Sequence, residues 1–243
     1  RTLDAEWDFI SAALPLLQTG NNDRLQTVCS KLYRFLHFTG RLDDLLWLSN
    51  QAEVSAIAAN NKERAGRNVY LAGMAYYLRN QPAEVLTCAA RAAEHWHDST
   101  AQNKATAIQL RGIGHQLNED YPAAIAAYQE VLEIDRSISS ESVNIAIDLD
   151  NLASAEKANG DYEAAERDYH EALRIAKINK DDEQTGNTTG NLAALALQRE
   201  QWAEAESLAR EALALAEKVG RLELIAGDCH RLAKALLMQR RSR

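Results

Sequence analysis

The sequence predicts an all-α protein, a right-handed superhelix of about twelve antiparallel helices over its 243 residues. The first observation is a repeat: the positions Leu42, Pro82, Tyr121, Tyr162 and Trp202 are 40, 39, 41 and 40 residues apart. A near-constant period of this length is typical of a solenoid built from one helical hairpin per repeat. The second observation is composition, because Ala and Leu dominate the apolar residues and there are only 11 Gly and 3 Pro. Both features favour helices over strands.

Apolar periodicity and helix-ending residues place twelve helices along the chain. We expect them at residues 3–18, 22–38, 41–58, 63–79, 82–96, 101–117, 121–135, 141–158, 161–178, 183–199, 202–218 and 222–238. Gly20, Gly40, Gly160 and Gly220 follow helical stretches. Glycine closes a last helical turn at little steric cost because it adopts the left-handed conformation easily.

Other residues mark helix starts. Pro82 and Pro122 fall in a first turn, where the missing N–H has no helical partner to lose. Residues 181–183 (DDE) place negative charge at the positive end of a helix dipole. Pro15 is expected to kink or end the first helix near Leu14.

Small residues recur where paired helices are expected to approach most closely. In the second helix of each hairpin these are Ala124, Ala165 and Ala205. In the first helix they are Gly73, Gly112, Ala153, Ala193 and Ala233. The regular spacing predicts a single repeat domain over 1–243, with a divergent hairpin at 1–40, repeats at 41–218 and a capping helix at 219–243.

Composition and motifs argue against several functional classes. The formal net charge is −8, whereas nucleic acid binding needs a basic surface, so no nucleic acid partner is expected. There is no membrane-spanning apolar run, no signal peptide and no phosphate-binding glycine loop. His95 and His97 are two residues apart and therefore face different sides of a helix, and the cysteines show no metal-binding spacing. We expect buried thiols, no metal, no cofactor, no catalytic residues, and a cytoplasmic location.

Two repeats carry a recognisable pattern: a small residue in the first helix, an aromatic after the turn, and alanine in the second helix. The pattern is clearest in 101–218, for example at Ala153, Tyr162 and Ala165. It resembles the tetratricopeptide repeat (TPR), in the longer-helix form of kinesin light chains and bacterial signalling proteins. The resemblance implies a scaffold that binds proteins or peptides and is not an enzyme.

The N-terminal stretches 3–14 (LDAEWDFISAAL), 19–22 (TGNN) and 32–41 (LYRFLHFTGR) carry a narrower resemblance. They look like the junction where TPRs begin after the nucleotide-binding module of bacterial STAND ATPases, the NB-ARC-like group that includes AfsR-type regulators. Residues 9–11 (FIS) stand where that group usually has Asn-Leu-Arg. The resemblance implies a ligand-sensing, autoinhibitory arm that contacts a nucleotide-binding module upstream of Arg1.

Residues of the first helix of each hairpin that flank the small packing position are expected to face a concave groove. They form a mixture of amides, charged groups and aromatics suited to a protein or peptide ligand. The candidate groove residues are Arg67, Tyr70, Tyr77, Gln109, Gln116, Asp150, Asn151, Lys157, Asn191, His230, Arg231 and Lys234.

Two alternatives remain open from the sequence. Asn151 and Asn191 either bind a peptide backbone or bond to neighbouring helices, and Tyr70 and Tyr77 either anchor a partner or are packing residues. For the function, the leading hypothesis is the sensing arm of a larger signalling ATPase or transcriptional regulator. The alternative is a standalone TPR adaptor that bridges partners without switching.

Overall fold

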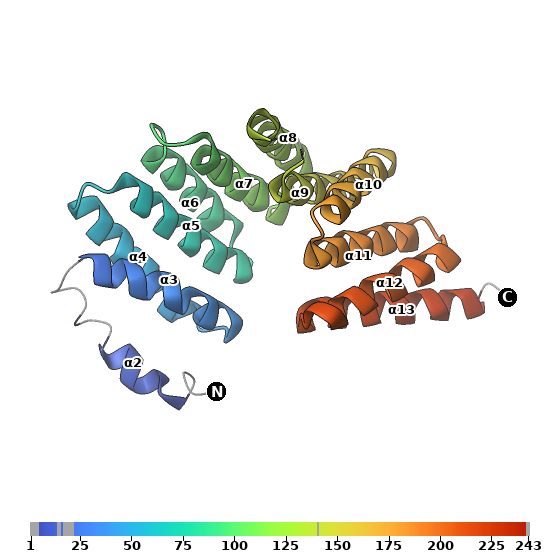
Figure 1. The fold of residues 1–243 in the computed structure, drawn as a ribbon, viewed down its shortest axis with the longest axis horizontal. Helices are drawn as coiled ribbons and strands as arrows, with labels where there is room; N and C mark the ends of the chain where they lie inside the picture. The colour runs from blue at the N-terminus through green and yellow to red at the C-terminus, as the bar shows by residue number, and fades with distance from the viewer. Residues whose placement is uncertain (1–4, 14–15, 17–21, 140, 242–243) are drawn as a thin grey trace. The chain divides into compact units, whose positions relative to one another are not determined.

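The computed structural model describes residues 5–13, 16, 22–139 and 141–241, and these form twelve α-helices and no strand (Figure 1). The helices are α2 (Trp7–Ala13), α3 (Asn22–Phe38), α4 (Leu42–Ala58), α5 (Lys62–Leu78), α6 (Pro82–His95), α7 (Ala101–Leu117), α8 (Tyr121–Ile138), α9 (Val143–Asn159), α10 (Tyr162–Ile178), α11 (Asp182–Gln198), α12 (Trp202–Val219) and α13 (Leu222–Arg241). The all-α prediction is confirmed, and from α3 onward every expected helix is present with ends within three residues. The kink expected at Pro15 and the cap expected at Gly20 lie outside the described residues.

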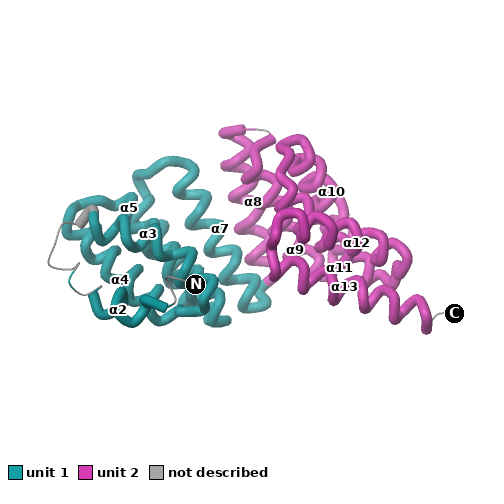
Figure 2. Tube along the Cα trace, turned by 60° about the horizontal axis from the view of Figure 1, so that its bottom comes forward, with its two compact units in different colours: residues 1–120 teal, residues 121–243 magenta. Residues whose placement is uncertain are grey.

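The chain divides into two compact units, Arg1–Asp120 and Tyr121–Arg243 (Figure 2). Within each unit, from α3 onward, every helix packs on the next one in sequence. The odd-numbered helices also touch one another within each unit: α5 touches α3 and α7 in unit 1, and α11 touches α9 and α13 in unit 2. We call α3, α5, α7, α9, α11 and α13 the A helices and α4, α6, α8, α10 and α12 the B helices. The A helices of each unit therefore form a row whose side chains can act together.

Most turns between helices share one backbone conformation, the exceptions being those from α6 to α7 and from α8 to α9 in the described residues. Gly40, Gly160 and Gly220 have φ values of 69°, 91° and 71°, which confirms their predicted role as helix ends. The same left-handed position is occupied at five more turns by Asn60, Asn80, Glu119, Lys180 and Glu200, with φ between 54° and 61°. In each turn the next amide bonds back to the last helical turn, as in the 2.9 Å bond from Gln201 N to Ala196 O.

The small packing positions lie in the seams between helices, as predicted. Ala153, Ala165 and Ala193 are fully buried. A Cβ atom added to Gly73 would come within 2.7 Å of Leu110, so nothing larger fits there without rearrangement. Ala233 is the exception, because it is exposed on α13, which has no B helix packed against this position in the described chain.

The three cysteine thiols likewise differ in burial. Cys29 and Cys88 are buried as expected. Cys229 is exposed, and the expectation of a buried thiol is wrong there, because this residue lies on the uncovered side of α13.

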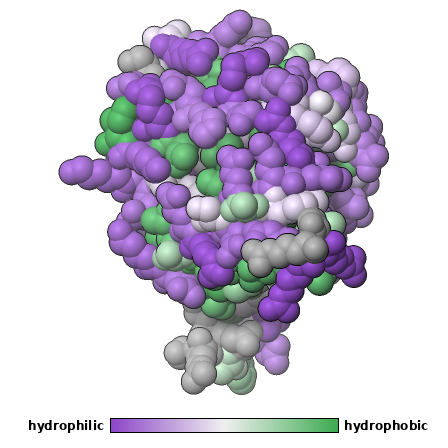
Figure 3. Space-filling view, turned by 90° about the vertical axis from the view of Figure 1, so that its right-hand side faces the viewer, coloured by the Kyte–Doolittle hydropathy of each residue, from purple (hydrophilic) through white to green (hydrophobic). Residues whose placement is uncertain are grey.

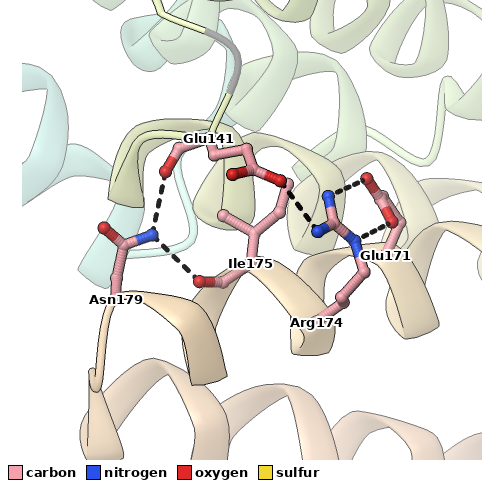
Figure 4. Close-up of polar contacts among 5 residues, drawn as sticks. All are labelled: Glu141, Glu171, Arg174, Ile175 and Asn179. Carbon is pink, nitrogen blue, oxygen red and sulfur yellow. Dashed lines mark hydrogen bonds and ion pairs between the residues drawn. The ribbon is translucent and has the colours of Figure 1, made fainter.

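Polar contacts at the surface tie the end of α10 to the segment before α9 (Figure 4). Asn179 donates from Nδ2 to the backbone oxygens of Glu141 and Ile175, both at 2.9 Å. Arg174 donates to Glu141 Oε1 at 2.8 Å and to both carboxylate oxygens of Glu171 at 2.8 and 2.9 Å. These bonds fix the start of α9 and therefore the position of its side chains in the A-helix row.

The face of the molecule seen in Figure 3 is mostly hydrophilic, with hydrophobic residues in small, separate groups. None of the helices in the described ranges is both long and apolar enough to cross a membrane.

Candidate functional site

The A helices of unit 2 carry a cluster of polar side chains around Asp150 of α9, which is 5% exposed. Asn187 and Asn191 of α11 are four residues apart, so they lie on one face of the helix. Asn191 donates from Nδ2 to Oδ1 and Oδ2 of Asp150, at 3.2 and 3.0 Å. Asn187 donates from Nδ2 to Oδ2 at 3.2 Å. The carboxylate thus joins two adjacent A helices through side-chain amides.

Electrostatic effects at Asp150 oppose one another. Burial raises the pKa of Asp150, whereas hydrogen bonds from Asn191 and Thr188 and the charges of Lys157 and Arg231 lower it. Two cations therefore lie close enough to act on this carboxyl group. Hydrogen bonds thus join Asp150 to α11, and the two cations act on it through their charge.

Lys157 lies about two turns after Asp150 on α9 and is half-buried. Its Nζ atom is 5.7 Å from the centre of the Tyr169 ring, and the hydroxyls of Tyr169 and Ser154 are 2.8 Å apart. Burial lowers the pKa of Lys157, and the charge of Arg231 lowers it further. Among the described residues no carboxylate forms an ion pair with Lys157. The ammonium group therefore lies between the Tyr169 ring and the charge of Asp150 without a direct ion pair.

Arg231 completes the cluster from α13. It donates from Nη1 to Oδ1 of the buried Asp228 at 2.6 Å. A Cβ atom on Gly190 would come within 2.7 Å of Asp228 Oδ1 and 3.1 Å of Arg231 Nη1. Gly190 thus lets the Arg231–Asp228 pair lie directly against α11.

The remaining unit 2 residues expected in the groove are less involved. Asn151 is half-buried and makes no polar side-chain contact within the described part of the chain. His230 and Lys234 are exposed on α13. The structure therefore brings together Asp150, Lys157, Asn191 and Arg231. Asn151, His230 and Lys234 lie outside this cluster.

Unit 1 has a smaller polar pocket of about 180 Å³ on its own A-helix row. It is lined by Gln26, Thr27, Ser30, Arg64, Arg67, Asn68 and Leu71. Asn68 donates from Nδ2 to Gln26 Oε1 at 2.8 Å, and Gln26 donates from Nε2 to the backbone oxygen of Ala52 at 2.7 Å. The floor of the pocket is therefore a chain of amides linking α5, α3 and α4.

The groove residues expected in unit 1 are spread over this row. Arg67 lines the pocket, whereas Tyr70 is half-buried against the hydrophobic core, and burial raises its pKa. Tyr77 is 42% exposed, so the two tyrosines differ in how much of the side chain a partner could reach. Gln109 and Gln116 are half-buried on α7 and do not line the pocket.

Sequence reasoning missed Gln26, Asn68, Asn187 and Asp228. Asn187 could have been found, because it precedes Asn191 by one helical turn on the same face. Asn68 and Asp228 gave a weaker signal, a polar residue at a position where periodicity predicts burial. Such residues indicate a contact between helices but not its partner.

His95 and His97 do not converge. His95 lies 3.1 Å from Glu53 Oε1, while His97 is exposed and contacts Asp98 at 2.7 Å. In the described ranges no three His, Cys, Asp or Glu side chains are grouped so that they could hold a metal ion.

Comparisons with known proteins agree with this architecture. The tetratricopeptide repeat family matches residues 144–218, which run from α9 to α12. A comparison with curated proteins finds no match.

Solved structures match over most of the chain. The apo form of RapI has a TM-score of 0.63 at 14% identity, covering 92% of this chain and 87% of that one. A putative kinesin light chain from Podosopora anserina with nearly identical TPR-like repeats has a TM-score of 0.61 at 18% identity, covering 84% and 100%. A Rap protein complexed with Competence and Sporulation Factor has a TM-score of 0.63 at 15% identity, covering 91% of this chain and 66% of that one. At these identities the likeness concerns the fold, and the chain is a TPR-like helical solenoid whose residues 144–218 match the tetratricopeptide repeat.

Proposed function

We propose that the chain is a protein- or peptide-binding TPR scaffold whose ligand lies along the A helices of unit 2. The observation that carries this proposal is the cluster around Asp150, in which amides and cations from three A helices are held in place. Asp150 holds Nδ2 of Asn191, so the carboxamide oxygen of Asn191 is the group left to accept an N–H from a ligand. Lys157 and Arg231 favour carbonyl or carboxylate oxygens beside it. This combination suits an extended peptide with an acidic group.

The similar structures are consistent with such a role. One of them is a Rap protein in complex with Competence and Sporulation Factor, so a protein of this fold can hold another molecule. TPR folds are generally scaffolds without catalytic chemistry, and we expect none here.

We further propose that this scaffold is the ligand-sensing, autoinhibitory arm of a larger bacterial STAND signalling ATPase or transcriptional regulator in the cytoplasm. The support is the resemblance of residues 3–41 to the junction after the nucleotide-binding module of that group. In this arrangement the arm contacts the upstream module until a ligand binds. The alternative is a standalone adaptor that bridges two partners. The separate polar pocket in unit 1 would then hold the second partner.

A display library of random peptides tests the binding proposal. The chain is expected to enrich acidic peptides, and Lys157→Ala and Arg231→Ala are each expected to weaken the best of them. Lys104→Ala, at an exposed lysine of unit 1, is the matched control and should leave binding unchanged. Enriched peptides that bind all three variants equally would contradict the proposed site.

The gene upstream of Arg1 separates the two contexts. A GxxxxGK[ST] motif encoded there supports the sensing arm, and its absence contradicts it and leaves the adaptor. The chain itself is expected to give no saturable ATP binding in calorimetry, because its sequence has no phosphate-binding loop.

A further inference from the structure

The outer side of α13 carries a continuous stripe of exposed apolar and small side chains. Leu222, Ala226, Cys229, Ala233 and Leu237 are four, three, four and four residues apart, which places them on one face of the helix. All five are exposed, and Leu222 and Leu237 are 77% and 50% exposed. We call these five residues the α13 stripe.

The corresponding face of α11 shows what such a stripe normally does in this fold. Forty residues earlier, Gly186, Thr189, Ala193 and Leu197 occupy the same positions, and all four are buried. The B helix α12 packs against α11. The α13 stripe is therefore a helix-packing face, and no helix in the described chain takes the place on it that α12 takes on α11.

The stripe is nearly symmetric about its centre. Leu222 and Leu237 are seven and eight residues from Cys229, and Ala226 and Ala233 are three and four residues from it. A second α13 running antiparallel, with a two-fold axis at Cys229, would place leucine opposite leucine and alanine opposite alanine. Small residues at the centre allow the two backbones to approach closely. Self-complementarity of this kind is what a two-fold interface requires.

Charges beside the stripe are complementary in the same arrangement. Glu223 and Lys234 lie along the same edge of the stripe, six residues before and five residues after Cys229. In an antiparallel pair the same edges meet, so Glu223 of each copy, which also pairs with Arg221 of its own chain, would lie beside Lys234 of the other. Lys234 is exposed and has no ion pair with a carboxylate of its own chain among the described residues. Opposite charges thus meet twice in this register.

From this pattern we propose that a second copy of the chain packs antiparallel on the α13 stripe, with the two-fold axis at Cys229. The contact is one pair of 20-residue helices, each about 30 Å long. Interfaces of this small size are usually reversible. The expected state is therefore a dimer that forms as concentration rises.

Sedimentation equilibrium over a concentration series tests this. Ala233→Glu, which places a charge against Ala226 of the other copy, is expected to weaken dimerisation roughly tenfold or more, because a desolvated charge would have no partner. Ala203→Glu, at an exposed position on α12, is the matched control and should dimerise like the parent. A chain that stays monomeric at all concentrations would leave the stripe to a helix from another protein or segment and overturn the proposal. A dimer whose dissociation constant is unchanged by Ala233→Glu would also overturn the proposal.

Two further measurements fix the register. Glu223→Lys and Lys234→Glu are each expected to weaken the dimer, and the double variant to restore it. A short bis-maleimide should link two chains through Cys229, and Cys229→Ser should abolish the link, because the other two cysteines are buried. The antiparallel register would be excluded if the double variant dimerised no more tightly than the single variants. It would also be excluded if a proven dimer gave no cross-link through Cys229.

Discussion

Asp150 receives hydrogen bonds from two amides of α11, and its carboxylate is almost completely buried. Asn191→Ala removes two of these bonds and leaves the carboxylate with fewer donors. We expect a loss of about 1–3 kcal/mol in the free energy of unfolding, measured by urea denaturation followed by circular dichroism. Asn151→Ala is the matched control: Asn151 has the equivalent repeat position but no polar side-chain contact in the described ranges, so we expect a change within about 0.5 kcal/mol. Equal effects of the two substitutions would contradict the role given to Asn191.

This pair also marks how far the sequence could define the site. Repeat spacing aligned Asn151 with Asn191 and placed Asp150, Lys157 and Arg231 on the same row, which the structure agrees with. It could not distinguish the two asparagines, because the difference depends on a contact between α9 and α11, 41 residues apart in sequence. Periodicity assigns a residue to a face of its helix but does not identify its partner across the seam.

Gly66 faces the ring of Trp96, which is 3% exposed and bonded through Nε1 to the backbone oxygen of Glu63. A Cβ atom at Gly66 would lie 2.5 Å from the ring, and the ring is held in place. We therefore expect Gly66→Ala to reduce stability by about 1–3 kcal/mol through overpacking. In Gly227→Ala the new atom meets only the end of the Arg231 side chain, at 3.1 Å, which can shift more easily than a buried ring although it pairs with Asp228. Thermal melts should show a clearly lower midpoint for Gly66→Ala than for Gly227→Ala.

The turns allow a test at the level of single elements. Glu200 has a φ of 61° between α11 and α12, where a side chain is strained and glycine is not. Glu200→Gly is expected to stabilise the protein by about 0.5–1 kcal/mol in thermal unfolding. Glu204→Gly, inside α12, should instead destabilise it by about 0.5–1 kcal/mol, because glycine is a poor helix former. A loss of stability in both variants would show that the Glu200 side chain makes contacts that outweigh its strain.

α9 should make the stability of unit 2 depend on pH. Glu156 of α9 is buried, and burial together with the charges of Asp168 and Asp161 raises its pKa to about 7, despite the opposing charge of Arg167. Its folded pKa therefore lies above its ordinary value of 4.5. The contribution of this group is fully present below about pH 4.5 and is lost as the pH rises toward about 7. Unfolding free energies across this range should fall less steeply for Glu156→Gln than for the parent, whereas exposed Glu204→Gln should match the parent.

At the scale of the whole molecule, contacts between nearby helices imply local responses to mutation. Ala165→Leu would overpack the seam between α9 and α10 and lower stability there by about 1–3 kcal/mol. In a repeat array such a change affects neighbouring repeats most. Hydrogen exchange should show faster exchange in α9 to α11 and little change in α4 to α6. A uniform increase across both units would indicate a single cooperative unit.

The sequence was most informative about features that repeat. Period, helix starts and glycine turns placed eleven helices from α3 onward, because each depends on local patterns. Features that occur once were harder to predict from the sequence. Ala233 and Cys229 follow the repeat pattern, and they are exposed only because no B helix covers them in the structure. The left-handed turns at Glu119, Lys180 and Glu200 were likewise not marked by glycine.

The neighbour-by-neighbour packing of the helices also has a mechanical consequence. Within each unit the packing contacts join helices that are adjacent or next-adjacent in sequence. Under tension, a unit of this kind can lengthen by small rotations at every alanine-lined seam, because no contact between distant helices has to break first. When the tension is released, the same seams can close again. Each unit should therefore behave as an elastic element that yields gradually and not as a block that ruptures at a single force.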